Sequence, residues 1–255
     1  MCDNTTDSFS YNCRVFSYPI GEHVTVYDRT ITKGTKNEKL TKAHQDNRER
    51  SIKQEEHSKQ VSLSRTKNNI YNIARSNVWE WFITLTFDRK ITDSSSYDEV
   101  VNKLQTMLEH IRQRKCPDMK YLIVPELHSD GVHYHFHGLL SNVDGMRFKF
   151  SGKYSKDMPI YNILDWSYGF TTATRVTDTQ RVSSYITKYI TKSSEQYLKE
   201  KRRYYASRNI EKAEPTYTII DEEDFQKTYT DRITYCKTIN IKQALQQVTY
   251  YELQD

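Results

Sequence analysis

Three histidines on alternate positions are the strongest chemical signal in the sequence. His133, His135 and His137 lie within residues 131–140, although the chain has only 8 histidines among its 255 residues. Residues two apart on a β-strand point to the same side, so these imidazoles are expected to line one face. Neutral imidazoles on a rigid face bind a divalent metal ion with little rearrangement. The alternative is a row of solvated histidines.

A carboxylate follows the neighbouring apolar segment. Glu126 ends residues 121–126 and is expected to lie across a hairpin from the histidines. Two histidines and one carboxylate suit Mg²⁺ or Mn²⁺ and leave open positions for phosphate oxygens. His128 is an alternative ligand, and the alternative for Glu126 is an ordinary acidic residue beside a turn.

Two tyrosines in the repeat YITKYITK form the second signal. Tyr185 and Tyr189 are four residues apart, and Lys188 and Lys192 each follow a tyrosine by three. On a helix, residues four apart share a face, about 6 Å apart along the axis. A phenol, with a pKa of about 10, is a poor nucleophile at neutral pH, and a nearby ammonium stabilises the phenolate or charge on a phosphate. The alternative is a Tyr/Ile stripe that packs a helix.

Apolar periodicity predicts the elements that must position these side chains. An amphipathic helix is expected over 97–114 and a helical segment over 179–205. The polar segment 33–60 is expected to be an exposed helix or a flexible arm, and 141–168 a long polar insertion. Strands are expected at 78–87, 121–125, 132–140 and 169–176, with one or two more in 13–32. This order predicts an α+β fold, an antiparallel sheet with helices packed on one face.

Composition limits the function less than these motifs do. The net charge is +5, and the 20 tyrosines against 9 phenylalanines suit contact with nucleic acid or have no functional meaning. Residues 33–67 hold ten Lys/Arg against five Asp/Glu, which fits a phosphate-contacting surface or a solvated face. The 4 cysteines form no CxxC pair and predict neither a zinc site nor a disulfide framework. Without a leader-like segment or an apolar run of about 18 residues, we expect a soluble, cytoplasmic protein.

Taken in order, these segments resemble the HUH endonuclease superfamily, in particular replication initiators of rolling-circle plasmids and small single-stranded-DNA phages. The likeness spans about residues 65–205. Residues 84–87 (TLTF) are similar to the family's first motif, and His135-Phe-His137 followed by Gly-Leu-Leu is similar to its metal motif. The repeat 185–192 is similar to its two-tyrosine motif. The extra His133 creates a second overlapping pair, and His135 with His137 is preferred because Gly-Leu-Leu follows it directly.

The resemblance implies both a fold and roles for residues. The fold is a sheet of about five antiparallel strands, like an RNA-recognition-motif core, with the tyrosine helix facing a metal site on the sheet. Glu126, His135 and His137 would hold Mg²⁺ or Mn²⁺, with His133 as a further candidate, and Thr84 and Thr86 would contact DNA. Tyr185 and Tyr189 would be the nucleophiles, assisted by Lys188 and Lys192. The endonuclease domain would cover 61–205, between an N-terminal extension, 1–60, and an acidic C-terminal extension, 206–255.

The implied activity is the nicking of a replication origin through a 5′-phosphotyrosyl link, which starts rolling-circle replication. The implied partners are single-stranded or hairpin origin DNA and a host helicase and DNA polymerase, in the cytoplasm of a bacterial host and without a membrane. An HUH transposase or relaxase is an alternative, although a transposase usually has one tyrosine and a relaxase places its tyrosine before the histidines. A non-cleaving DNA-binding regulator is the other alternative.

Overall fold

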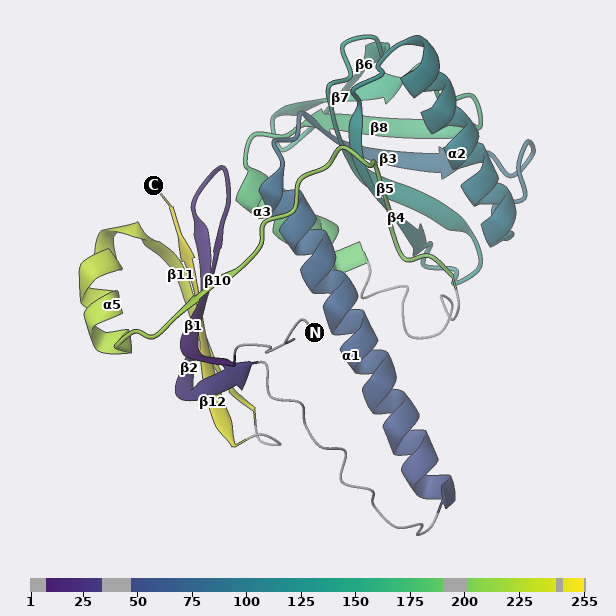
Figure 1. The fold of residues 1–255 in the computed structure, drawn as a ribbon. Coiled ribbons are helices and arrows are strands. Elements are labelled where there is room, and N and C mark those ends of the chain that lie inside the picture. Colours follow the sequence, from purple (N-terminus) through teal and green to yellow (C-terminus); the bar gives the residue numbers. More distant parts are fainter. Residues whose placement is uncertain (1–7, 34–46, 190–200, 242–244, 255) are drawn as a thin grey trace, which may run out of the picture. The chain divides into compact units, whose positions relative to one another are not determined.

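The chain divides into two compact units. A computed structural model describes residues 8–33, 47–189, 201–241 and 245–254, with residues 47–56 described by their backbone only. One unit comprises residues 53–212, and the other combines residues 1–52 with 213–255. Figure 1 labels the elements of both units.

The unit of residues 53–212 is built on a seven-stranded antiparallel sheet. Its strand order is β6-β7-β8-β3-β5-β4-β9. The strands are β3 (Trp81–Phe87), β4 (Lys120–Leu127), β5 (Tyr134–Ser141), β6 (Phe148–Ser155), β7 (Met158–Ile163), β8 (Gly169–Arg175) and β9 (Tyr205–Ala206). Its helices in the described residues are α1 (Asn47–Ser76), α2 (Tyr97–Arg114) and α3 (Thr179–Ile186).

Helix α2 covers one face of this sheet. The helix begins after Ser96, whose side chain accepts a hydrogen bond from the Glu99 N–H, and it has acidic residues in its first turn. Both features satisfy or complement the free N–H groups of a helix start. Its buried residues pack with alternate residues of the central strands into one core, which includes Val100, Leu104, Ile111, Ile83, Leu85 and Phe136.

Helices α1 and α3 cover the opposite face. Their buried residues are Ile70, Ile73, Ala74 and Ile186, and these pack against Leu122, Val124 and Leu139 of β4 and β5. The expectation of helices on one face only is therefore wrong. The physical reason lies in β4 and β5, which are buried on both sides and so need cover on both.

The α+β class predicted from sequence is confirmed, and the helix predicted at 97–114 has those bounds. Two local predictions fail. Residues 141–168 contain the hairpin β6–β7, whose mostly exposed side chains give no apolar alternation to detect. The helix predicted over 179–205 ends at Ile186 in the described part of that segment, and Tyr205 belongs to β9. Tyr205 is buried and pairs with Ile123 of β4, so sheet pairing overrides the helical pattern there.

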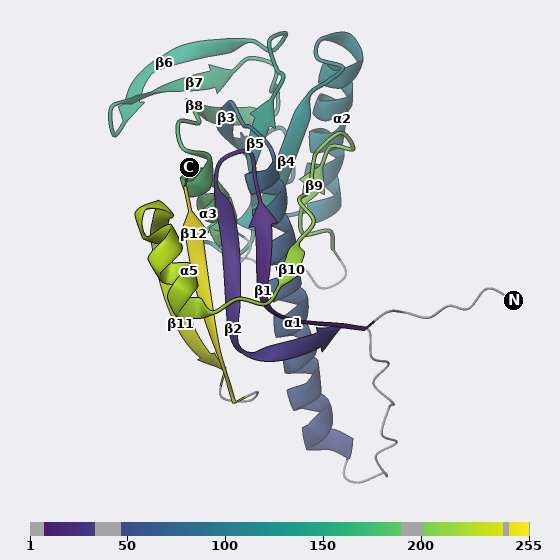
Figure 2. The same cartoon turned by 60° about the vertical axis from the view of Figure 1, so that its left-hand side comes forward.

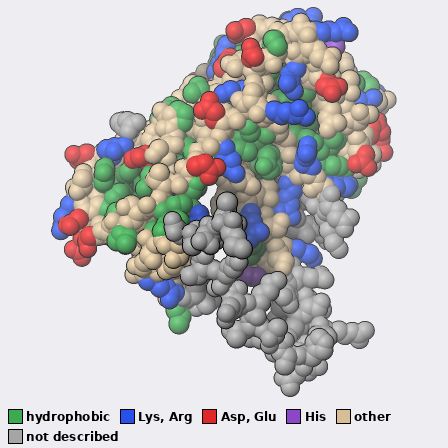
Figure 3. Space-filling view, viewed as in Figure 1, with side chains coloured by type: hydrophobic (Ala, Val, Ile, Leu, Met, Phe, Trp, Pro, Cys, Tyr) green, Lys and Arg blue, Asp and Glu red, His purple; other side chains and the backbone are tan. Residues whose placement is uncertain are grey.

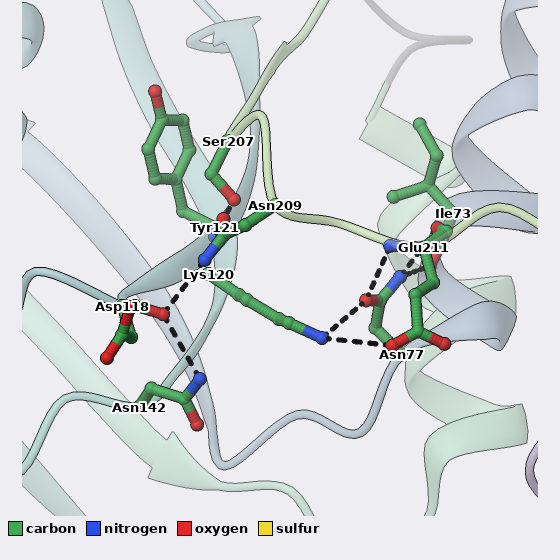
Figure 4. A network of polar contacts seen from close by, with 9 residues as sticks. All are labelled: Ile73, Asn77, Asp118, Lys120, Tyr121, Asn142, Ser207, Asn209 and Glu211. Atoms are coloured by element: carbon green, nitrogen blue, oxygen red, sulfur yellow. Dashed lines mark hydrogen bonds and ion pairs between the residues drawn. The ribbon is translucent and has the colours of Figure 1, made fainter.

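A polar network fixes the chain where it leaves the sheet edge (Figure 4). The Asn77 amide donates to the Ile73 and Glu211 carbonyls at 2.8 and 2.9 Å, and its oxygen accepts from the Glu211 N–H at 3.0 Å. Ser207 and Tyr121 exchange hydrogen bonds of 3.0 and 3.1 Å across the same edge. This network fastens residues 207–211 to α1 and β4 within the same unit.

The other unit is a five-stranded antiparallel sheet of order β10-β1-β2-β12-β11. Figure 2 shows it with α5 (Glu222–Tyr229), which runs into a short 3₁₀ turn (Thr230–Arg232). Side chains of α5 pack against Cys13, Val24, Val26, Tyr251 and Leu253. Its strands are β1 (Phe9–Ser17), β2 (Glu22–Lys33), β10 (Thr216–Thr218), β11 (Ile233–Ile241) and β12 (Gln246–Leu253).

The segments 1–60 and 206–255, expected as separate extensions, thus contribute strands to one sheet. Residues of β2 pair with β12, as Val26 does with Thr249. The acidic run Glu222, Glu223 and Asp224 forms the first turn of α5 after the cap Asp221, where negative charge stabilises a helix. The run therefore has a structural reason.

Charged side chains do not gather into one field on the face shown in Figure 3, where basic and acidic groups are interspersed. Most of the basic stretch 33–67 lies outside the described side chains, and its contact with phosphate stays a prediction. Within the described residues, no helix has the length and apolar character that crossing a membrane requires.

Candidate metal centre

Pairing across three strands brings a carboxylate and two imidazoles together. Glu126 of β4 lies opposite His135 of β5. On the other side of β5, His135 pairs with Thr86 and His137 with Thr84 of β3. Directly opposed residues of antiparallel strands share a face, and this face is the one that α1 and α3 cover nearby.

The three side chains converge on one point. Glu126 Oε2 lies 2.7 Å from His135 Nε2 and 2.8 Å from His137 Nε2, and the two Nε2 atoms are 3.0 Å apart. The three ligand atoms lie within 4.8 Å of one another. Glu126 and His137 are buried, and His135 is partly buried. This group can bind a metal ion.

The carboxylate is prepared as an anion. Burial alone would raise the pKa of Glu126, but hydrogen bonds from His135 and His137 outweigh it and lower that pKa to about 2. Glu126 is therefore ionised at neutral pH and offers a hard oxygen ligand.

Each imidazole has a neighbour at its other nitrogen. Thr84 Oγ1 lies 3.1 Å from His137 Nδ1, and His128 Nε2 lies 3.1 Å from His135 Nδ1. An imidazole that binds a metal through Nε2 carries its proton on Nδ1, and a partner that accepts this proton orients the ring. The donor set and its partners therefore fit a divalent ion held by Glu126, His135 and His137.

His128 is suited to the accepting role. Burial, and then the nearby His135, lowers the pKa of His128 below its ordinary value. A neutral His128 keeps a lone pair that can accept the His135 Nδ1 proton. Glu126 and His128 stand two apart in the sequence, and this spacing is the signal that could have suggested a supporting role for His128.

His133 does not join this group. Strand β5 begins at Tyr134, after the turn, and His133 Nδ1 lies 2.8 Å from Asp130 Oδ2. Asp130 also accepts the backbone N–H groups of Val132 and His133 and pairs with Arg89. The strand alternation expected to align three histidines therefore starts one residue too late for His133.

Gly138, which follows the histidine pair, is required by packing. A Cβ at Gly138 would lie 2.8 Å from Ile123 Cγ1 and 3.2 Å from the Leu122 carbonyl oxygen. Only glycine fits this approach of β4 to β5 without a shift. Because β4 carries Glu126, this packing helps to hold the carboxylate against the histidines.

Both tyrosines lie at the metal-competent group. The Tyr189 ring stacks on His137 with centroids 3.6 Å apart and an angle of 17°. Tyr185 contacts Tyr189 edge-on at 5.2 Å, and Phe82 of β3 contacts both rings. Asp178 caps α3 by accepting the Arg181 N–H, which fixes the start of the helix that carries Tyr185.

The two phenols differ in environment. Tyr189 is 8% exposed and Tyr185 is 44% exposed. Burial raises the pKa of Tyr189, and its contact with Tyr185 and the charge of Glu126 raise it further. Lys188 Nζ lies 5.7 Å from the centre of the Tyr185 ring. Lys192 lies outside the described residues.

Thr84 and Thr86, expected at the DNA, are placed on the metal face of β3. The Thr84 hydroxyl is engaged with His137, while Thr86 lies in the next cross-strand row, between His135 and Phe170 of β8. The aromatic contact of Phe82 went unpredicted, although its alternation with Thr84 and Thr86 puts it on the same face.

Comparison with known proteins agrees with these features. Neither the curated proteins nor the solved structures gave a match. Glu126, His135, His137 and both tyrosines all fall within residues 80–194, and it is these residues that match the model of a family described as replication-associated protein ORF2.

Proposed function

We propose that this protein is a metal-dependent DNA nickase that starts rolling-circle replication through a tyrosine–DNA link. The observation that carries the proposal is the stacking of Tyr189 on His137, 3.6 Å between ring centres, with Tyr185 beside it. A phenol nucleophile and a metal-competent group therefore share one site. The match of residues 80–194 to a replication-associated family supports the same conclusion.

Glu126, His135 and His137 hold Mg²⁺ or Mn²⁺ in this proposal. When bound, the ion polarises a phosphate of single-stranded origin DNA and offsets charge that develops on it. The remaining chemistry belongs to the chain. Thr84 and His128 orient the imidazoles, and the sheet face beside them supports the DNA strand.

The reaction is an in-line displacement at phosphorus. The phenol oxygen of a tyrosine bonds to phosphorus while the bond from phosphorus to the 3′ oxygen breaks. The phenol loses its proton and the leaving 3′ oxygen gains one. The products are a 5′-phosphotyrosyl link and a free 3′-OH, which a host polymerase extends in the bacterial cytoplasm while a host helicase unwinds the duplex. Because one phosphodiester replaces another, religation needs no ATP.

The two tyrosines divide the work. Tyr185 is more exposed and has Lys188 beside its ring, so Tyr185 makes the first attack. Lys188, with Lys192, offsets the negative charge of the phenolate or phosphate. Tyr189, buried against His137 with its pKa raised, attacks the second junction after one round and releases the displaced strand.

A covalent-capture experiment tests this function without knowledge of the origin sequence. Full-length protein is mixed with a randomised single-stranded DNA pool and Mn²⁺, and protein–DNA adducts are isolated on a denaturing gel and sequenced. We expect adducts that share a sequence at the linked 5′ end, and we expect EDTA to abolish them. The Tyr185→Phe/Tyr189→Phe double variant should form none. Equal adduct formation by that variant, or cleavage without adduct, would refute the proposal.

A further inference from the structure

Strand β8 extends the metal face on the side of β3 away from the histidines. Phe170 of β8 pairs with Thr86, and Thr172 pairs with Thr84. Since Thr86 also pairs with His135, and His135 with Glu126, one cross-strand row runs from Glu126 through His135 and Thr86 to Phe170. Neighbouring strands are about 4.8 Å apart, so Phe170 lies about 10 Å from His135 along this row.

The side chain of Phe170 is exposed on this face. It is 72% exposed, and Thr172 is exposed as well, whereas Thr171 and Ala173 between and after them are buried towards α2. Alternation along β8 therefore separates a core face from a solvent face. A large aromatic ring on the solvent face gains nothing from the core.

The backbone pins Phe170 in this position. A Cβ on the preceding Gly169 would lie 2.3 Å from the Thr86 carbonyl oxygen and 2.4 Å from the Asp88 nitrogen. Only glycine permits this approach of β8 to β3. The register that places Phe170 opposite Thr86 is therefore set by close backbone packing.

The surroundings suit a nucleic-acid strand. The hydroxyls of Thr86 and Thr172 stand in adjacent rows beside the ring, and β8 contains no acidic residue that would repel phosphate. Flat aromatic rings on an open sheet bind single-stranded nucleic acid by stacking on a base, whatever its sequence. Of the aromatic side chains on the metal face of β3 and β8, Phe82 is engaged with both tyrosines, which leaves Phe170 for this role.

We propose that Phe170 is a base-stacking subsite for single-stranded DNA, assisted by Thr172, that positions the strand a few nucleotides from the metal-competent group. The proposal rests on the nickase function and adds to it a residue that holds the substrate without taking part in the chemistry. Stacking fixes one base, so the phosphate to be cut is held in register over Glu126, His135 and His137.

The test measures binding alone. An oligothymidylate that contains one 2-aminopurine is titrated with the full chain in EDTA, and fluorescence quenching reports stacking. We expect Phe170→Ala to weaken binding by about 5- to 150-fold and to abolish the quenching. Phe170→Trp should preserve both. Phe150→Ala is the matched control, since Phe150 is an exposed phenylalanine of the same sheet, 43% exposed, whose ring packs with Tyr154 and Tyr161.

Three results would overturn the subsite. These are wild-type binding by Phe170→Ala, an equal loss with Phe150→Ala, and a change in self-association by sedimentation with DNA affinity intact. Circular dichroism checks that each variant is folded. Because the titration needs neither metal nor tyrosine, its failure is separable from failure of the nickase. Covalent adducts without stacking would leave the nickase and remove the subsite, and stacking without adducts would do the reverse.

Discussion

At the scale of single residues, the candidate centre shows what a strand period can and cannot foresee. The period of two predicts that His135 and His137 share a face, and they do. It cannot foresee that Asp130 takes His133, because β5 begins only at Tyr134. Nor can it show that Thr84 supports His137, since that contact depends on the pairing of β3 with β5.

The first prediction concerns the metal ligands. Replacing His135 or His137 with Ala, or Glu126 with Gln, removes one of three converging ligand atoms. We expect Mn²⁺ affinity, measured by isothermal titration calorimetry, to fall at least about 10-fold for each variant. His133→Ala is the matched control and should bind as the wild type does. A fall for His133→Ala comparable to the others would show that the ion is held differently.

The second prediction concerns the partner of His137. Thr84→Val keeps the shape of the side chain but removes the oxygen that lies 3.1 Å from His137 Nδ1. Loss of such an orienting partner costs about 10- to 100-fold in metal affinity, and calorimetric titration with Mn²⁺ checks it. Thr86→Val, one row away on the same face, should have little effect. Equal affinities for the two valine variants would argue against the orienting role of Thr84.

At the scale of elements, sequence patterns succeed where one face is buried and fail where burial comes from distant pairing. Helix α2 has the predicted bounds because its apolar residues recur every three or four positions towards one core. Hairpin β6–β7 escaped prediction because most of its side chains are exposed. The prediction of helix up to residue 205 failed at Tyr205, which is buried at the sheet edge, with its hydroxyl 2.9 Å from that of Tyr97.

The third prediction concerns Asp165, which follows β7 and ties it to the end of α2. Asp165 forms an ion pair with Lys115 and accepts the Arg147 N–H at 2.7 Å. Burial would raise the pKa of Asp165, but the hydrogen bond from Lys115 and those from Arg147 outweigh it, so the pKa is lowered. A lowered native pKa stabilises the fold above the unfolded pKa of about 3.9, and this stabilisation is lost as pH falls through the native pKa.

Asp165→Asn should therefore reduce the free energy of unfolding by about 1–3 kcal/mol near neutral pH. The difference from the wild type should shrink as the pH falls below about 4. Urea denaturation at several pH values measures both. A difference that stays constant over this range would mean that the charge of Asp165 does not matter.

At the scale of the whole molecule, each of the two units has its own buried cluster. The pairing of β2 with β12 joins residues more than 200 positions apart, as in Val24 with Tyr251. No local pattern encodes such a partner, which is why residues 1–60 and 206–255 were expected as separate extensions. The metal-competent group, by contrast, uses only β4 and β5 of the unit 53–212, whose hairpin is local in sequence.

The fourth prediction follows from this division. A ligand stabilises only the states that bind it, by about 2.7 kcal/mol at a concentration 100 times its Kd. Mn²⁺ should therefore slow amide hydrogen exchange in peptides from β4 and β5 and leave β11 and β12 unchanged. Hydrogen-exchange mass spectrometry of the full chain measures both. Equal protection of β11 and β12 would show that the two units open together.

The most direct measurement of the account is to locate the DNA on the protein. Trypsin cuts after Arg181, Lys188 and Lys192 and so separates Tyr185, in peptide 182–188, from Tyr189, in peptide 189–192. Adducts formed with Mn²⁺ are trimmed with nuclease, digested and sequenced by tandem mass spectrometry. We predict a nucleotide joined through its 5′ phosphate to Tyr185, and to Tyr189 when Tyr185 is replaced by Phe. A 3′ phosphate linkage, or attachment to any residue other than these two tyrosines, would contradict the account.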